Sequence, residues 1–361
     1  MIVDGKPYRA IWFDNNSQSV NIIDQRFIPH ELKVIELNNL QEIWTAIRDM
    51  YVRGAPLIGV TAAFGFALAI RENNRGFNVE KITEFLCSAR PTAVNLRWAC
   101  EFMSQKINNS QEKNLEKFAL HLAQEIADDD VKTNTLIGKN GVELIRSISA
   151  QKTNSSPVKI LTHCNAGWLA TVDRGTATAP IYEAAEQGIE VEVWVDETRP
   201  RNQGASLTCW ELYHNNISHT LIVDNAGGHL MQKGEVDLVI VGSDRTAING
   251  DVCNKIGTYL KALAAFDNNI PFYAALPTST IDFTIDDGFQ IPIEERGQDE
   301  VLQMQGTNQD GKFDTINITS KGIKAANPAF DVTPAKYVSG IITEKGVVKA
   351  NLESISKLEK L

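Results

Sequence analysis

One stretch in the second half of the chain places charged side chains directly after a short apolar run. The run Asp237-Leu-Val-Ile-Val241 is rich in β-branched residues, which is typical of a strand buried on both faces. Asp244 follows it, and Asn254 and Lys255 come after a further turn, at the start of a helix predicted over residues 256–266. A carboxyl group at the end of a buried strand is partly desolvated, which raises its pKa and suits it to donate a proton. Asp244 is therefore a candidate acid, although Asp and Asn also commonly cap turns and helices.

Cys164 is the second candidate for chemistry. It follows a predicted strand over 159–162 and precedes Asn165-Ala-Gly167, a loop that could place backbone N–H groups near the sulfur. Neighbouring cations or a helix N-terminus would lower the pKa of such a thiol towards the thiolate. Most cysteines are simply small buried residues. A Cys/His nucleophilic pair is disfavoured, because His163 points to the opposite face if the strand continues.

Two arginines precede predicted helix starts in turns rich in Gly or Pro. Arg53 is followed by Gly54 and Ala55, before an apolar helix over 60–70, and Arg90 is followed by Pro91 and Thr92, where Thr92 is expected to hydrogen-bond locally. Free N–H groups at a helix start attract anions, and glycine allows close approach of the backbone. With Lys255, these arginines are the cations placed to meet a phosphate. A packing turn between helices is the alternative reading of the segment around Arg53.

Strands and helices alternate from Val158 onwards, which predicts a parallel, doubly wound, Rossmann-like sheet. The predicted strands are 159–162, 191–195, 220–223, 237–241 and 271–275. Polar residues follow all of these strands, and ligands bind at that edge of an open α/β sheet. Because no G-x-G-x-x-G or G-x-x-x-x-G-K-[ST] motif is present, a dinucleotide or P-loop nucleotide is not indicated.

The N-terminal part has a different pattern, of short antiparallel strands followed by helices. Strands are predicted over 9–13, 19–23 and 32–37, and a helix over 40–50. A connecting helix is predicted over 114–148, with a charged interruption at Ala127-Asp-Asp-Asp130. We therefore expect two domains, a mostly helical one over 1–128 with a small β element, and a catalytic sheet domain over 129–361.

Composition limits the classes of function. The 361 residues are 43% hydrophobic with a formal net charge of -10, and Lys and Arg form no block, which argues against nucleic-acid or membrane-surface binding. No signal peptide or run of eighteen apolar residues occurs, which predicts a cytoplasmic protein. The five cysteines form no C-x-x-C pair and the six histidines have no metal-ligand spacing, so neither a structural metal nor a cofactor is expected.

Several long motifs occur in an order that resembles one known family. They include Arg53-Gly-Ala-Pro, Arg90-Pro-Thr-Ala-Val-Asn-Leu96, Thr162-His-Cys-Asn-Ala-Gly167, Asp196-Glu-Thr-Arg-Pro-Arg-Asn-Gln-Gly204, Gly242-Ser-Asp-Arg245, Asn254-Lys-Ile-Gly-Thr258 and Pro292-Ile-Glu-Glu-Arg296. The chain resembles the methylthioribose-1-phosphate isomerases, whose family also holds regulatory subunits of a eukaryotic translation-initiation exchange factor. The resemblance covers about residues 6 to 348.

The resemblance implies a metal-free aldose–ketose isomerase of methionine salvage, acting on S-methyl-5-thioribose 1-phosphate as a homodimer. It implies Cys164 and Asp244 as catalytic residues. The substrate contacts that it implies are Arg53, Gly54, Ala55, Arg90, Gln203, Asn254 and Lys255. Ser243 stands where the family usually has Ala, a change that leaves every implied catalytic group in place.

Two alternatives stay open from the sequence. An isomerase of the same chemistry could act on ribose 1,5-bisphosphate or 5-deoxyribose 1-phosphate, depending on what surrounds the 5-substituent. A non-catalytic regulatory subunit is the alternative of another class, and the presence of Cys164 and Asp244 together argues against it. The sequence does not choose between hydride transfer and an enolate route for the hydrogen shift.

Overall fold

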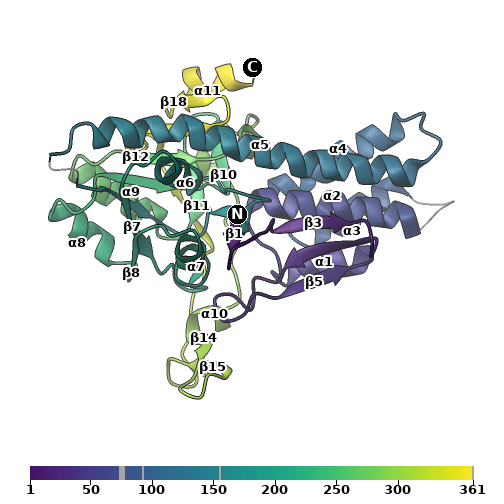
Figure 1. The fold of residues 1–361 in the computed structure, drawn as a ribbon, viewed down its shortest axis with the longest axis horizontal. Coiled ribbons are helices and arrows are strands. Elements are labelled where there is room, and N and C mark those ends of the chain that lie inside the picture. The colour runs from purple at the N-terminus through teal and green to yellow at the C-terminus, as the bar shows by residue number, and fades with distance from the viewer. Residues whose placement is uncertain (73–77, 92, 154–155, 360–361) are drawn as a thin grey trace.

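The computed structural model describes residues 1–72, 78–91, 93–153 and 156–359. The predicted contact of Thr92 lies outside these residues. The chain forms a helical part with a small antiparallel sheet and a second part built on a parallel sheet (Figure 1). Helix α5 (Leu115–Ser149) runs along both parts. The mixed α/β fold class is therefore confirmed.

The N-terminal part packs its helices around α2 (Ala55–Glu72). Every residue of α2 from Leu57 to Ile70 is buried, and although this helix is long and apolar enough to cross a membrane, 78% of it is buried inside the protein. It is thus the core helix of this part. The elements around it are β1 (Ile2–Val3), β2 (Lys6–Pro7), β3 (Ile11–Asp14), β4 (Ser19–Ile23), β5 (Val34–Leu37), α1 (Leu40–Arg48), α3 (Val79–Ser88) and α4 (Val94–Asn108). Strands β3, β4 and β5 form the predicted antiparallel element.

The large sheet has the strand order β18-β17-β12-β9-β6-β7-β8, and all of its strands are parallel except β18. Its strands are β6 (Val158–Thr162), β7 (Val191–Asp196), β8 (His219–Ile222), β9 (Leu238–Val241), β12 (Phe272–Ala275), β17 (Gly340–Thr343) and β18 (Gly346–Val348). The five predicted strands are confirmed, whereas β17 and β18 were missed. The chain order reverses between β6 and β9, and ligands of doubly wound sheets bind beside that point.

Helices α6 (Ala179–Glu186), α7 (Cys209–His214), α8 (Ala226–Gln232) and α9 (Thr258–Asp267) connect these strands, and a π-helical turn over Gly204–Thr208 precedes α7. The prediction of a helix opening at Asn254 is wrong. Asn254 and Lys255 lie in strand β11 (Val252–Lys255), which pairs with β10 (Arg245–Ala247) and β16 (Phe330–Thr333). The turn at Asn249-Gly250 folds β10 back on β11, so the helix begins only after Gly257, whose φ is 101°.

Helix α5 continues through the acidic run at 127–130, so the predicted interruption is wrong. Asp128 and Asp129 are exposed, and a charged run on the solvent side of a helix does not break it. The proposed domain boundary between 128 and 129 lies inside this helix and remains a proposal.

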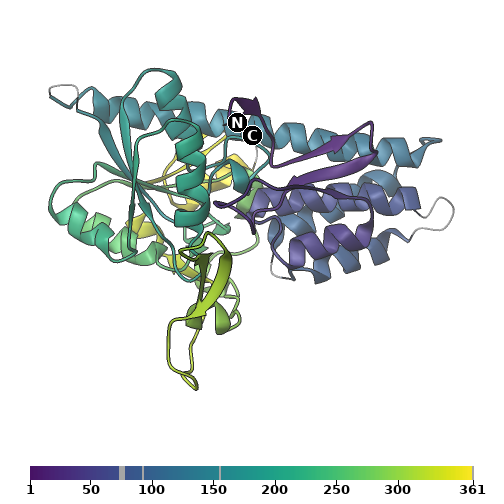
Figure 2. The ribbon, with the colours of Figure 1, turned by 60° about the horizontal axis from the view of Figure 1, so that its bottom comes forward.

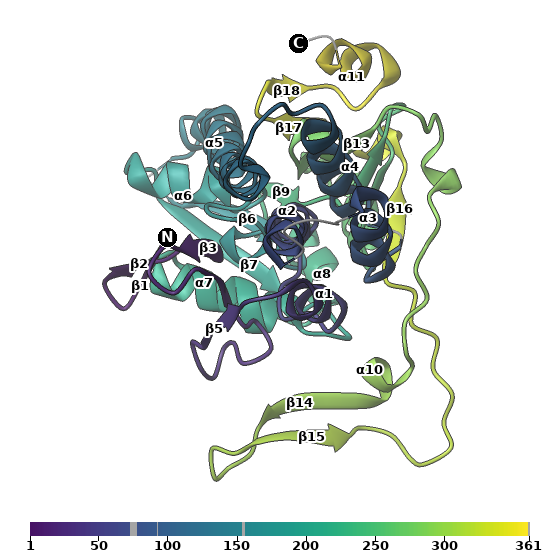
Figure 3. The same cartoon turned by 90° about the vertical axis from the view of Figure 1, so that its right-hand side faces the viewer.

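A hairpin of β14 (Gln303–Thr307) and β15 (Phe313–Asn317) projects from the body of the molecule, as Figure 2 and Figure 3 show. The remaining elements are β13 (Ile281–Asp282), which joins β10, the short helix α10 (Asp299–Leu302) and the C-terminal helix α11 (Leu352–Leu358). Short 3-10 turns lie at Trp168–Ala170, Thr278–Thr280, Gly288–Gln290 and Ala335–Tyr337.

Candidate functional site

All of the predicted site residues line one cavity. It lies between the turns that precede α2 and α4 and the loops that follow β6 and β9. The predicted residues that line it are Arg53, Gly54, Ala55, Arg90, Cys164, Gln203, Asp244, Asn254 and Lys255. Cys164 and Asp244 follow separate strands and line the same cavity, so both can contact one ligand.

Cys164 lies in a strained loop at the end of β6. Its φ is 68°, in the left-handed region that residues other than glycine rarely adopt. Its backbone N–H donates to Thr198 Oγ1 at 2.8 Å, and its Sγ lies 3.1 Å from Gln203 Oε1. These contacts fix the position of the sulfur at the cavity wall.

Burial raises the pKa of the Cys164 thiol, while the positive charges of Lys255 and Arg53 act in the opposite direction. The neighbouring cations therefore favour the thiolate, as expected, but the expected net shift towards the thiolate is wrong for this site. Desolvation outweighs both cations because the thiol lies among buried groups. Burial therefore favours the protonated thiol.

Asp244 lies just beyond β9, and its backbone N–H donates to Cys253 O at 2.9 Å. Burial raises the pKa of its carboxyl group, although Lys255, Arg90 and Arg53 act to lower it. The predicted direction of this shift is confirmed. A carboxyl group that keeps its proton to higher pH than usual is suited to act as an acid.

Arg53 is almost fully buried and is held by a neutral partner. Its Nη1 and Nη2 donate to the backbone oxygen of Asn165 at 3.0 and 2.9 Å, and Nη2 also donates to Asn165 Oδ1. Within the described ranges, no carboxylate lies within ion-pair distance of Arg53 or of Lys255. Both cations can therefore meet an anionic ligand without breaking an ion pair.

Asn254 and Lys255 reach the cavity from β11. Asn254 Nδ2 donates to Thr258 Oγ1 at 3.0 Å, and Lys255 Nζ lies 4.7 Å from the ring centre of Phe330. Burial lowers the pKa of Lys255, while Cys164 and Asp244 act to raise it. This lysine therefore loses less hydration than an exposed one when it binds an anion.

Two further arginines, Arg201 and Arg296, line the cavity and were missed as site residues. Arg201 pairs with Glu300 at 2.8 Å, and Arg296 pairs with Glu300 at 2.7 Å. Arg90 and Arg296 share Glu294, at 3.1 and 2.8 Å. Both missed residues lie within motifs that carry the resemblance, but no local pattern marks them, because they sit in irregular segments.

Gly54 brings the backbone beside Arg53 close to the opposite wall. Its φ is +98°, and a Cβ there would lie 2.4 Å from the backbone oxygen of Ala170. We expect Gly54→Ala to lower the free energy of unfolding by about 3 kcal/mol or more, because backbone strain and a steric clash add together. Gly5→Ala is the matched control, since Gly5 has φ +77° with no atom within 4 Å of its Cβ position. Equal losses for both variants in urea unfolding would contradict the role of close packing at Gly54.

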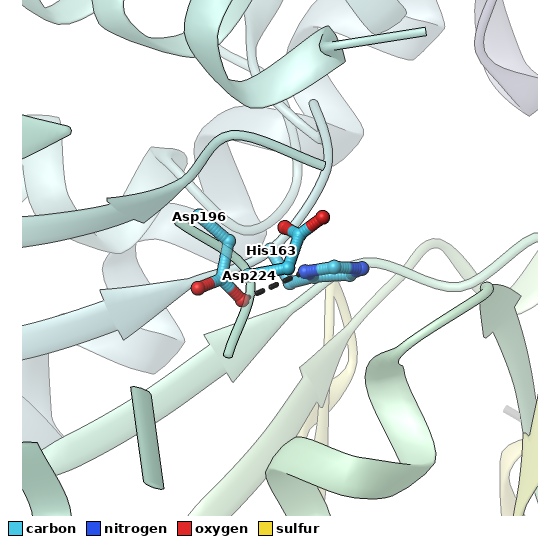
Figure 4. Close-up of side chains that lie close together, drawn as sticks. All are labelled: His163, Asp196 and Asp224. Atoms are coloured by element: carbon cyan, nitrogen blue, oxygen red, sulfur yellow. Dashed lines mark hydrogen bonds and ion pairs between the residues drawn. The ribbon is translucent and has the colours of Figure 1, made fainter. Parts of the chain in front are cut away.

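A buried cluster behind Cys164 has the composition of a metal site (Figure 4). His163 Nδ1 lies 2.8 Å from Asp196 Oδ2, and Asp224 lies nearby. However, Lys261 Nζ lies 3.1 Å from the same Asp196 oxygen. His163 Nε2 also contacts Ile256 O at 2.8 Å, and both Asp224 oxygens accept backbone N–H groups at 2.7 Å. Among the described residues, only the buried Asp196 Oδ1 of these ligand atoms has no hydrogen-bond partner. The lysine supplies the positive charge, so the cluster is better suited to holding the ends of β6, β7 and β8 together.

Comparison with known proteins finds relatives that carry the name of the family that the sequence resembles. The chain is 57% identical to a methylthioribose-1-phosphate isomerase of Sinorhizobium medicae over 99% of both chains. It is 51% identical to the protein of that name from Escherichia coli, over 99% of this chain and 96% of that one.

Two solved structures share the fold. The 5-methylthioribose 1-phosphate isomerase of Pyrococcus horikoshii is 40% identical with a TM-score of 0.83, covering 98% of this chain and 96% of that one. A protein of A. fulgidus described as translation initiation factor eIF-2B, subunit delta, is 39% identical with a TM-score of 0.79, covering 98% and 100%. The model of the Initiation factor 2 subunit family matches residues 51–350, and the chain belongs to this family.

Proposed function

We propose that this protein is an aldose–ketose isomerase of methionine salvage. It converts S-methyl-5-thio-α-D-ribose 1-phosphate into S-methyl-5-thio-D-ribulose 1-phosphate. The observation that carries the proposal is that Cys164 and Asp244 line one buried cavity together with several cations. Full-length identity above half to methylthioribose-1-phosphate isomerases supports the same substrate.

In this proposal the phosphate binds to Arg53, Arg90 and Lys255. Charge-assisted hydrogen bonds contribute about 1.5–3 kcal/mol each, enough together to offset the negative field of the whole protein. Arg53 and Lys255 contribute most, because neither has an ion-pair partner among the described residues, whereas Arg90 is paired with Glu294. Gly54, Ala55, Gln203 and Asn254 complete the substrate contacts.

The reaction begins with opening of the sugar ring. Because O1 carries the phosphate, the ring does not open spontaneously as that of a free sugar does. Asp244 donates its proton to the ring oxygen, and the bond between C1 and that oxygen breaks. A hydrogen then moves from C2 to C1, and the hydroxyl on C2 loses its proton to the Asp244 carboxylate, which leaves a ketone at C2 and restores the acid.

Burial favours one of the two routes for that hydrogen. Removing a proton from C2 needs a base beside that carbon, and burial raises the pKa of the Cys164 thiol, which disfavours its thiolate. Direct hydride transfer from C2 to C1 needs no such base, and Cys164 then assists by contacting the C2 hydroxyl. An enolate route would need the thiolate, which burial disfavours.

The test is an NMR assay of the purified protein with methylthioribose 1-phosphate deuterated at C2. We expect the aldose to be consumed and the deuterium to be retained at C1 of the ketose in light water. Ribose 1,5-bisphosphate and 5-deoxyribose 1-phosphate serve as competing substrates. A higher kcat/KM with either of them would overturn the substrate assignment, and loss of deuterium to solvent would overturn hydride transfer.

A regulatory subunit is the second candidate, because the A. fulgidus protein of similar fold is described as a translation initiation factor subunit. A purely binding protein has no need for both an acid and a thiol in the same cavity, which argues against this candidate. Absence of turnover with all three sugar phosphates would favour it.

We also propose that the protein is a cytoplasmic homodimer with a Rossmann-like catalytic domain. The exposed apolar side chains of Leu221, in the edge strand β8, and of Val223, directly after that strand, support association between two copies. Size-exclusion chromatography with light scattering measures the mass directly.

A further inference from the structure

A fully buried carboxylate behind the cavity takes no part in the proposed chemistry. Glu211 of α7 has no exposed surface. Its Oε1 accepts from Asn165 Nδ2 at 3.0 Å and from the backbone N–H of Leu169 at 2.8 Å. Its Oε2 accepts from the backbone N–H of Trp168 at 3.1 Å and from the Tyr182 hydroxyl at 3.3 Å. Four hydrogen-bond donors surround this one buried carboxyl group, which is more than the packing of a helix residue requires.

The loop above Glu211 is shaped to admit this carboxylate. A Cβ at Gly167 would lie 1.7 Å from Glu211 Oε2, so the loop can approach the acid only with glycine at this position. The two backbone N–H groups that bind Glu211 follow directly after Gly167. Glu211 thereby fixes the loop that begins at Cys164.

Asn165 connects Glu211 to Arg53. The Asn165 amide nitrogen donates to Glu211 Oε1 and, at 3.1 Å, to Thr208 Oγ1. Because the nitrogen and oxygen of an amide point in different directions, these bonds turn Oδ1 towards the Arg53 guanidinium, which donates to it. Thr208 also donates to the backbone oxygen of Cys164 at 2.7 Å, so the same group of contacts supports the sulfur.

The Asn165 amide lies between Glu211 and Arg53, so it can orient the Arg53 guanidinium without neutralising its charge. A carboxylate in direct contact would form an ion pair that competes with a phosphate for the guanidinium. Here the acid lies one residue away. Burial lowers the pKa of Arg53, and the charge of Glu211 acts in the opposite direction. The neutral Asn165 side chain orients the guanidinium, and the positive charge of the guanidinium remains available to a ligand.

We propose that Glu211 is a positioning residue that acts through Asn165 to orient Arg53 for binding the substrate phosphate. This inference rests on the proposed function in assigning Arg53 to the phosphate. It adds a residue that sequence patterns do not mark, because a glutamate in a short helix normally faces solvent.

The test compares Glu211→Gln with Tyr182→Phe. Both change a contact in the same buried cluster, but only the first alters the group that accepts from Asn165. We expect Glu211→Gln to raise KM and the Kd for inorganic phosphate by about tenfold or more, with a smaller change in kcat, because one charge-assisted contact is misaligned. Tyr182→Phe should lower the melting temperature while leaving KM and phosphate affinity within about twofold, because its hydroxyl contacts Glu211 and not Asn165.

Wild-type phosphate affinity in a folded Glu211→Gln protein would overturn the inference. If that variant does not fold, Asn165→Asp provides the test, because it places a carboxylate directly on Arg53 and should weaken phosphate binding by at least about tenfold. Unchanged affinity in Asn165→Asp would equally overturn it. Calorimetry with inorganic phosphate needs no turnover, so a failure of this inference is distinguishable from a failure of the isomerase proposal, which shows as no turnover by the wild-type protein.

Discussion

Replacing Cys164 with serine should lower kcat by about a hundredfold or more, because the shorter hydroxyl misplaces the contact with the C2 hydroxyl and a misplacement of about 1 Å can cost about 10²-fold. The serine hydroxyl fits the space of the thiol and can keep the contact with Gln203. It is smaller and less polarisable than sulfur and much less acidic, so it cannot replace the thiol beside the C2 hydroxyl. We therefore expect a folded protein that binds substrate with nearly wild-type affinity but turns it over very slowly.

Cys253→Ser is the matched control for that variant. Cys253 is a buried thiol on β11, next to the site residue Asn254 but in the wall of the neighbouring cavity. Stopped assays of both variants, with melting curves to establish folding, separate a specific effect from a general one. Turnover by Cys164→Ser at the level of the control would refute the assignment of Cys164.

Replacing Asp244 with asparagine should lower kcat by a similar factor, because the amide cannot donate a proton that the ring oxygen will keep. The amide has nearly the same shape, so binding of the sugar phosphate should persist. The backbone contact of residue 244 with Cys253 O is independent of the side chain. Turnover close to wild type would refute the role of Asp244 as the acid.

The pH dependence of kcat/KM in the wild-type protein and in Asp244→Asn gives a separate check on Asp244. Its pKa is raised by burial, so the active, protonated form persists above the usual carboxyl range and is lost as pH rises through the folded-state pKa. The corresponding decline in kcat/KM should be absent from the residual activity of Asp244→Asn.

A raised carboxyl pKa also means that the folded state loses stability as pH rises from the unfolded-state pKa to the folded-state pKa. Asp244→Asn should therefore be at least as stable as wild type at neutral pH, as measured by denaturant unfolding.

Much of the sheet domain could be predicted from sequence because local patterns determine it. Short β-branched runs such as Leu238–Val241 are buried on both faces and have little alternative to being strands. Polar residues after those strands had to meet at one edge, and the structure places Cys164 and Asp244 around one cavity there. Their catalytic roles remain predictions.

The errors arose where distant segments decide the outcome. Lys255 lies in a strand because β16, far along the chain, pairs with β11, and no local pattern shows that partner. The raised pKa of Cys164 reflects burial by the whole fold, which a list of neighbouring cations does not reveal. Arg296 and Glu211 were missed for the same reason, since each is placed by contacts between parts of the chain that are remote in sequence.

The most direct measurement is a crystal structure of the Cys164→Ser variant soaked with methylthioribose 1-phosphate. We expect the sugar inside the cavity, with its ring oxygen within hydrogen-bond distance of Asp244, C2 facing residue 164, and the phosphate on Arg53 and Lys255. A sugar phosphate bound outside this cavity, or one whose ring oxygen faces away from Asp244, would contradict it.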